Sequence, residues 1–146
     1  MIDAALGDAA VTHLQALLRI DTTNPPGGET AAAEYLAGLL TQPRVEITLV
    51  GAEQSRRCLV ARLRGDGSAA PLLLSAHLDV VPAEGARWRH PPFAGIIDDG
   101  YLYGRGAIDM KHMAVMAALV LGRLAAEGGR LRRDVIFAAV ADEEMG

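Results

Sequence analysis

Two apolar stretches of the sequence end in side chains that can bind a metal or transfer a proton. His77 and Asp79 follow the run "LLLSA", and the acidic residues 142–144 follow "VIFAAVA". Asp109 begins a third apolar stretch that lies between them. Imidazole and carboxylate groups are ligands that zinc accepts, and a carboxylate beside a metal can act as a general base. These residue types point to hydrolysis by a metal-activated water.

The apolar stretches predict the elements that position these residues. Residues 71–81 begin with an unbroken apolar run, and residues 135–141 are apolar throughout, which is typical of strands buried on both faces. Residues 109–127 are rich in helix formers. Strand, helix and strand in this order predict a βαβ unit with a right-handed crossover and a parallel pair, and we expect residues 71–81 to be a central strand. Ligands of open α/β sheets bind at the carboxyl ends of such strands, so the candidate residues should meet at one rim.

An imidazole and five carboxylates at one rim would require a compensating positive charge, and a divalent metal is the simplest one. Two metal ions about 3.5–4 Å apart, bridged by a carboxylate, form a known hydrolytic arrangement. Each residue also has a plainer explanation. His77 could be an ordinary strand-end histidine, Asp109 a helix N-cap, and the pair Glu143 and Glu144 a solvated loop. Their convergence on one rim favours the metal site.

The remainder of the chain predicts a small α/β domain. Helices are expected at residues 4–19 and 30–40, and an antiparallel pair of strands at 45–51 and 57–65. Residues 82–108 contain three prolines and five glycines and form the longest irregular stretch. Loops of this length inside compact domains are usually functional.

Composition excludes several classes of protein. With 146 residues, 51% of them hydrophobic and 22% charged, the chain has the size of one domain and is not a disordered polymer. A net charge of −4 argues against a nucleic-acid partner. The longest apolar run, residues 114–121, is far shorter than the roughly 20 residues of a spanning helix, so no membrane association is expected. Cys58 is the single cysteine, and residues 1–20 do not have the pattern of a signal peptide. Both observations lead us to expect a cytoplasmic location.

Three motifs carry a resemblance to a known family. The stretches "SAHLDVVPA", "WRHPPFAGIIDDGYLYGRGAIDMK" and "AVADEEMG" resemble, in order, the signatures of zinc metallopeptidases and deacylases. That family includes glutamate carboxypeptidase, aminoacylase, acetylornithine deacetylase and succinyl-diaminopimelate desuccinylase. The match runs from about Ile20 to the last residue, and "DTTNPPGGE" is also typical of the family's first loop.

The resemblance implies both a fold and an activity. The fold would be α/β, a three-layer catalytic domain with a mixed, largely parallel central sheet flanked by helices, incomplete in this chain. The activity would be hydrolysis of an amide or peptide bond in a small peptide or N-acyl amino acid. The cofactor would be zinc, two ions in the complete enzyme, with cobalt or manganese as substitutes.

The resemblance also implies a role for each candidate residue. His77 would bind one zinc, and Asp79 would orient that histidine. Asp109 would bridge both ions. Glu143 would be the general base acting on the metal-activated water, and Glu144 would bind the second zinc. Each ion would then have two of the three protein ligands usual for catalytic zinc.

Relatives supply the missing ligands from a later carboxylate and a histidine near the C-terminus, and they carry a smaller lid or dimerisation domain. We therefore expect residues 1–146 to be the N-terminal part of a catalytic domain, inactive alone, with a homodimer as an option for the full-length protein. One alternative is a non-catalytic remnant or binding module that retains the fold. A metal-dependent phosphoesterase is another, although such a site would gain from cationic groups for phosphate and only Arg105 and Lys111 are expected near it.

Overall fold

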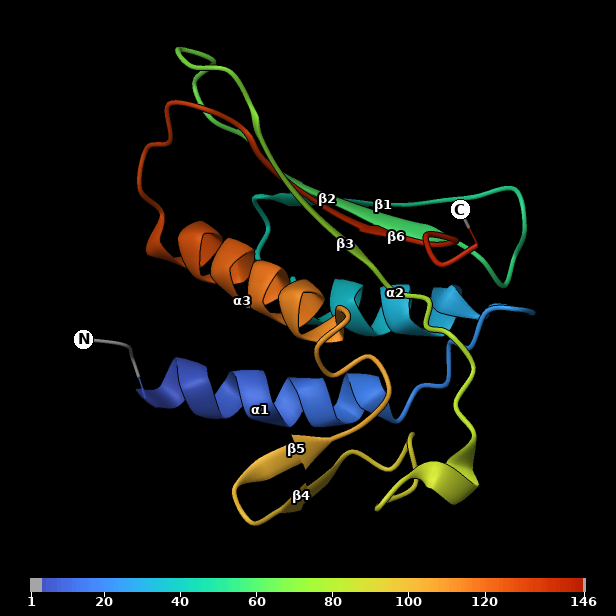
Figure 1. Cartoon of the computed structure of the whole chain (residues 1–146). Coiled ribbons are helices and arrows are strands. Elements are labelled where there is room, and N and C mark those ends of the chain that lie inside the picture. The colour runs from blue at the N-terminus through green and yellow to red at the C-terminus, as the bar shows by residue number, and fades with distance from the viewer. Residues whose placement is uncertain (1–3, 146) are drawn as a thin grey trace.

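The computed structural model describes residues 4–145, which form a sheet with helices stacked below it (Figure 1). Its elements in chain order are α1 (Ala4–Leu18), α2 (Glu29–Leu39), β1 (Val45–Val50), β2 (Cys58–Leu63), β3 (Leu72–His77), the 3-10 helix η1 (Gly85–Arg87), β4 (Ile96–Asp98), β5 (Tyr101–Tyr103), α3 (Lys111–Glu127) and β6 (Val135–Val140).

The main sheet has the strand order β1-β2-β6-β3. Its β1–β2 and β2–β6 pairs are antiparallel, and its β3–β6 pair is parallel. The predicted α/β class with a mixed sheet is confirmed, as are the antiparallel pair of strands and the parallel pair joined by a helix. The two parallel strands, β3 and β6, are those whose carboxyl ends lead to the candidate residues.

The predicted central position of residues 71–81 is wrong in the described part of the chain. There β3 is an end strand, and β6 lies between it and β2. Leu73 on β3 is 60% exposed. An apolar run indicates that a strand is hydrophobic, but it does not identify the strands beside it. The sequence therefore could not distinguish a central strand from an end strand.

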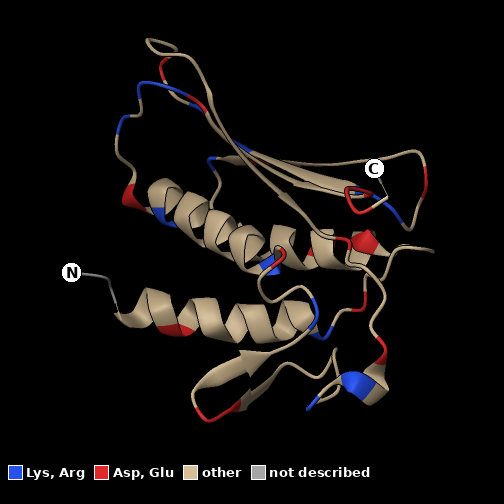
Figure 2. Ribbon diagram, in the orientation of Figure 1, with Lys and Arg blue, Asp and Glu red and all other residues tan. Residues whose placement is uncertain are grey.

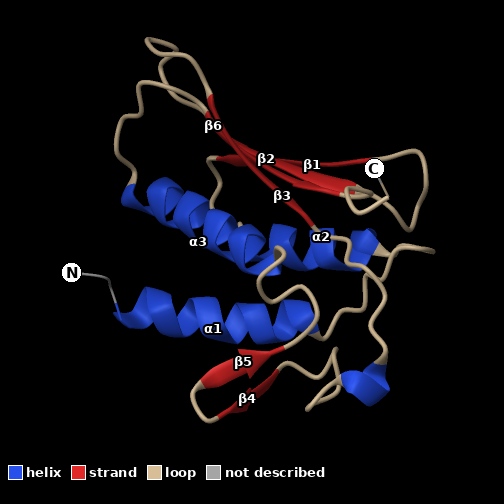
Figure 3. Ribbon diagram, viewed as in Figure 1, coloured by secondary structure: helices blue, strands red, loops and turns tan. Residues whose placement is uncertain are grey.

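The helices cover one face of the sheet in two layers (Figure 3). Alternate residues of β6 are buried, as expected of a strand with a period of two, in a core that also contains residues of α2 and α3. Phe137 at the centre of β6 is fully buried. Burial of a side chain of this size stabilises the fold by about 1.5–3 kcal/mol relative to an exposed one. α1 packs on the far side of α3 and completes the stack.

The long stretch at residues 82–108 contains a hairpin that the sequence analysis missed. β4 and β5 pair through a two-residue turn, in which Asp99 and Gly100 have φ of 50° and 78°. Hairpin turns of this type need positive φ at both central residues, and "DG" between short apolar pieces is their usual signal. Gln15 of α1, and Arg19 directly after this helix, donate hydrogen bonds to carbonyl groups just before β4. The stretch is therefore a folded element beside α1.

No helix within residues 4–145 combines the length and the apolar character that crossing a membrane requires.

Candidate metal and catalytic site

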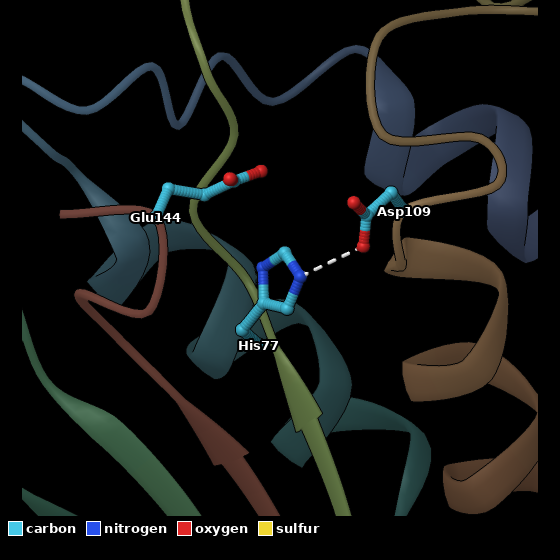
Figure 4. A group of neighbouring side chains, drawn as sticks. All are labelled: His77, Asp109 and Glu144. Carbon is cyan, nitrogen blue, oxygen red and sulfur yellow. Dashed lines mark hydrogen bonds and ion pairs between the residues drawn. The ribbon is translucent and has the colours of Figure 1, made fainter. Parts of the chain in front are cut away.

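The β3–α3–β6 unit brings three of the predicted ligand residues together. His77 is the last residue of β3 and pairs with Val140, the last residue of β6. Asp109 lies in the loop that leads into α3, and Glu144 follows β6. One ligand atom from each of these three side chains lies within 4.8 Å of the other two, and the carboxylates converge on the imidazole (Figure 4).

His77 is held through its ring nitrogen Nδ1, and its Nε2 faces two carboxylates. Its Nδ1 lies 3.0 Å from the backbone carbonyl of Asp79, so this nitrogen carries a proton and donates it. The other nitrogen, Nε2, is 3.0 Å from Oδ1 of Asp109 and 3.8 Å from Oε2 of Glu143. A histidine whose second nitrogen donates to a carbonyl is the usual metal-binding arrangement.

Burial of His77 by itself lowers its pKa, but the hydrogen bond with Asp109 and the contacts with Asp79 outweigh burial, and the pKa is raised overall. This result reflects the lone pair of Nε2, which faces a carboxylate oxygen at 3.0 Å. Two acceptors at that distance need a proton or a metal ion between them. The side chain of His77 is 5% exposed whereas that of Asp109 is 75% exposed, so the pair faces outward from a buried base.

The three side chains fit a divalent metal. Two ligands about 2 Å from one ion can lie about 4 Å apart, close to the 4.8 Å within which these atoms gather. One imidazole and two carboxylates also have the donor chemistry that zinc and related divalent ions accept. The described residues thus include a group that could hold a divalent metal ion.

Asp79 lies beside His77, but its carboxylate has a second set of partners. Its carbonyl holds the ring, whereas its Oδ1 is 3.5 Å from Nδ1 of His77. The carboxylate accepts the backbone N–H groups of Glu143 and Glu144 at 3.1 and 3.0 Å. Burial would raise the pKa of Asp79, but the amide of Asn24 and these two N–H groups lower it more. Asp79 therefore supports both the histidine and the acidic turn.

The plainer explanation of Asp109 as a helix cap is wrong. α3 begins at Lys111, its N-cap residue is Met110, and no side chain makes a cap hydrogen bond. The carboxylate of Asp109 instead points to His77 (Figure 4). Glu143, the predicted base, is 60% exposed and lies 3.8 Å from Nε2 of the same imidazole.

A second set of residues supports the turn after β6, and sequence reasoning did not assign it a role. Asn24 donates to Asp79 and to Asp142, both at 2.9 Å. Arg56 joins Asp142 at 2.7 Å to Glu29 at 3.0 Å. In Figure 2 the acidic turn after β6 lies beside the basic segment before β2. The one signal was the loop "DTTNPPGGE", which contains Asn24 and Glu29.

Comparison with known proteins identifies a family that matches this chain. The model of peptidase family M20/M25/M40 matches residues 73–146. The succinyl-diaminopimelate desuccinylase of Methylobacterium sp. (strain 4-46) is 42% identical over 136 residues, which are 89% of this chain and 33% of the relative. Aminoacylase-1 of Sus scrofa is 34% identical over 139 residues, which are 94% of this chain and 34% of that protein. The chain thus spans about a third of the length of these relatives.

Solved structures share the fold. An M20 family metallo-carboxypeptidase from Sulfolobus solfataricus has a TM-score of 0.76 at 22% identity, over 93% of this chain and 31% of its own. Human carnosine dipeptidase 1 has a TM-score of 0.75 at 25% identity, over 95% of this chain and 33% of its own. A dinuclear metal binding peptidase of the M20 family from Bacillus subtilis has a TM-score of 0.61 at 19% identity, over 94% of this chain and 35% of its own.

The resemblance seen in the three motifs is confirmed, because the family model covers the segment that carries all of them and the relatives extend the match over most of the chain. This chain belongs to peptidase family M20/M25/M40.

Proposed function

We propose that this chain is part of a metal-dependent hydrolase that cleaves an amide or peptide bond in small peptides or N-acyl amino acids. The observation that carries the proposal is the group formed by His77, Asp109 and Glu144. The names of the relatives, a desuccinylase, an aminoacylase and a carboxypeptidase, support the bond type. The residues that bind the substrate's carboxylate are expected largely outside the present chain.

The proposed cofactor is zinc, as two ions, with cobalt or manganese as substitutes. His77 would hold one ion, Glu144 the other, and Asp109 both. A neighbour of the same family described as a dinuclear metal binding peptidase supports two ions. When bound, the metal would polarise the scissile carbonyl and make a water more acidic.

The protein's own groups have distinct proposed roles. Glu143 is the general base, because its carboxylate is exposed and lies 3.8 Å from Nε2 of His77. The carbonyl of Asp79 keeps the proton of His77 on Nδ1, so that Nε2 remains a ligand. The carboxylate of Asp79 holds the backbone of Glu143 and Glu144.

We also propose that residues 1–146 correspond to the N-terminal part of a catalytic domain. The chain covers about a third of its relatives, which supports further ligands and a smaller lid or dimerisation domain in the complete protein. A homodimer of that complete protein, and a cytoplasmic location based on the single cysteine, belong to the same proposal.

A metal titration tests the site itself. We expect wild-type chain to bind Zn²⁺ or Co²⁺, and Asp109→Ala to weaken binding at least tenfold, because Asp109 would serve both ions. Glu46→Gln is the matched control, since Glu46 is an exposed acid paired with Arg64 on the sheet. Equal binding by all three proteins would contradict the metal site and favour a binding module that retains the fold.

An activity assay tests the assignment of ligands. With two protein ligands for each ion in place of the usual three or so, the 146-residue chain is expected to hydrolyse N-acyl amino acids and dipeptides slowly or not at all. Hydrolysis at ordinary enzymatic rates that disappears in Glu143→Ala would show that this ligand count is wrong.

A further inference from the structure

The turn after β6 has an unfavourable backbone conformation. Asp142 has a φ of 70°, in the left-handed region that few residues other than glycine adopt. The next two residues are the proposed base, Glu143, and the proposed ligand, Glu144. A left-handed residue at this point directs the chain back toward His77, so the conformation of Asp142 determines where both carboxylates begin.

The carboxylate of Asp142 is fixed by two donors. Oδ1 accepts a hydrogen bond of 2.9 Å from Nδ2 of Asn24 and one of 2.7 Å from Nη2 of Arg56. Both donors come from segments far from Asp142 in the sequence, and together they lower its pKa. The side chain of Asp142 is 56% exposed, so burial does not hold it in place.

Arg56 is itself held rigidly. Its Nε and Nη2 donate to the two oxygens of Glu29, at 3.3 and 3.0 Å, as a fork that a lysine could not form. Glu29 is fully buried and also accepts the N–H of Gly28 at 3.0 Å. A buried ion pair of this kind is a weak source of stability, because both charges lose their water. The ion pair is better explained by the position in which Glu29 holds the guanidinium of Arg56.

Asn24 links the same turn to the end of β3. It is 2% exposed, and its backbone N–H donates to the carbonyl of Val80 at 2.9 Å. Its side-chain amide divides its two hydrogens between Oδ2 of Asp79 and Oδ1 of Asp142. Asp79 also accepts the N–H groups of Glu143 and Glu144. The buried amide of Asn24 therefore orients both carboxylates that hold the turn, those of Asp79 and Asp142.

We propose that Asn24 and Arg56 are positioning residues: they hold Asp142 in its left-handed conformation and thereby place Glu143 and Glu144 beside His77. Asn24 acts through Asp79 and Asp142, whereas Arg56 acts through Asp142. The functional part of this inference rests on the proposed metal-dependent hydrolysis. The part that concerns the conformation of the turn does not depend on a metal.

The test compares three variants with the wild-type chain. Arg56→Gln removes the charge that joins Glu29 to Asp142. Asp142→Asn weakens the same link from its exposed end, and asparagine tolerates a left-handed backbone, so this variant is expected to fold even if Arg56→Gln does not. Arg64→Gln is the control, because it breaks an exposed ion pair with Glu46 on the same sheet.

Two measurements separate positioning from general stability. Amide hydrogen exchange of Glu143 and Glu144, followed by NMR without metal, reports the two hydrogen bonds to Asp79. The visible absorption of Co²⁺ reports the ligand geometry and the affinity. We expect Arg56→Gln and Asp142→Asn to speed exchange at these two amides severalfold more than elsewhere, and to weaken Co²⁺ binding about tenfold or more with a changed spectrum.

Arg64→Gln is expected to change neither measurement. The inference is overturned if exchange at the two amides in Arg56→Gln and Asp142→Asn matches that in Arg64→Gln. If wild-type chain binds no Co²⁺, the proposed function fails, whereas the exchange rates still decide whether Arg56 and the carboxylate of Asp142, which accepts from Asn24 and Arg56, hold the turn. Fast exchange with unchanged Co²⁺ binding would overturn the link from the turn to the metal.

Discussion

Gly27 lies directly against the guanidinium that supports the acidic turn. A Cβ at this position would be 2.5 Å from Nε of Arg56 and 3.0 Å from Oε2 of Glu29, and the φ of Gly27 is +81°. Gly27→Ala must displace Arg56 and also place a side chain in a left-handed backbone. We expect it to lower the free energy of unfolding by about 2–4 kcal/mol, measured by urea denaturation, because a hydrogen-bonded charge loses its partners.

Gly128 offers a matched control for that prediction. It ends α3 with a φ of +68°, and no atom lies within 4 Å of the position that its Cβ would take. Gly128→Ala therefore introduces backbone strain alone, about 1–2 kcal/mol. An equal decrease in the free energy of unfolding in the two variants would mean that the contact with Arg56 does not contribute to the effect of Gly27→Ala.

The candidate ligands could be predicted from the sequence because each is adjacent to an apolar run that predicts its element. His77 ends one strand, Glu144 follows another, and Asp109 precedes the helix between them. The positions of Asn24 and Arg56 could not be predicted in the same way. The hydrogen bond from Asn24 to Asp142 spans 118 residues, and nothing local in the chain marks its two ends as partners.

At the scale of elements, Asp134 joins the start of β6 to β2. Its carboxylate accepts the N–H of Gly65 at 2.8 Å and that of Nε of Arg62 at 2.7 Å, and these bonds lower its pKa. A carboxyl group whose pKa is lower in the folded state stabilises the protein above its unfolded pKa, about 3.9, and loses this effect as the pH falls through its folded pKa.

We therefore expect Asp134→Asn to be less stable than wild-type chain at pH 7, and to lose less additional stability than wild type below about pH 4. Urea midpoints measured from pH 7 down to acid denaturation would test this. Two curves that stay parallel over the whole range would show that Asp134 makes no pH-dependent contribution.

Elements were predictable where hydrophobic periodicity dominates and less so where turns do. The helix expected at residues 30–40 is found at Glu29–Leu39, and the parallel pair was correctly anticipated. The strand expected at 71–81 is shorter, Leu72–His77, because its partner β6 ends at Val140 opposite His77, and Val80 hydrogen-bonds instead with the segment around Thr22. That segment is remote in sequence, so its pairing could not be read from local pattern.

At the scale of the whole molecule, an apolar groove of about 370 Å³ lies between β3 and α3. Its lining residues are Leu73, Leu74, Ser75, Met113, Met116, Ala117 and Val120. Within residues 4–145, β3 has β6 on one side and no strand on the other. End strands with unpaired backbone groups and exposed apolar side chains favour association. We expect the 146-residue chain to self-associate as its concentration rises, as seen by sedimentation velocity.

Leu73→Lys should reduce this association, because it places a charge on the exposed end strand, where Leu73 is 60% exposed. Ile97→Lys is the control, since Ile97 is 49% exposed but lies on the β4–β5 hairpin. Association that is unaffected by Leu73→Lys, or reduced equally by both variants, would place the contact elsewhere.

The strand order has a consequence for how the chain assembles during synthesis. β2 and β3 both precede β6 in the sequence, yet they are neighbours of β6 and not of each other. Chains are made from the N-terminus at about 5–20 residues per second, so segments can fold before later ones emerge. Arg56, next to β2, and His77, on β3, acquire their final separation only after residues 135–140 insert between the two strands. The group formed by His77, Asp109 and Glu144 therefore cannot be complete before residues 135–144 have been synthesised and β6 lies beside β3.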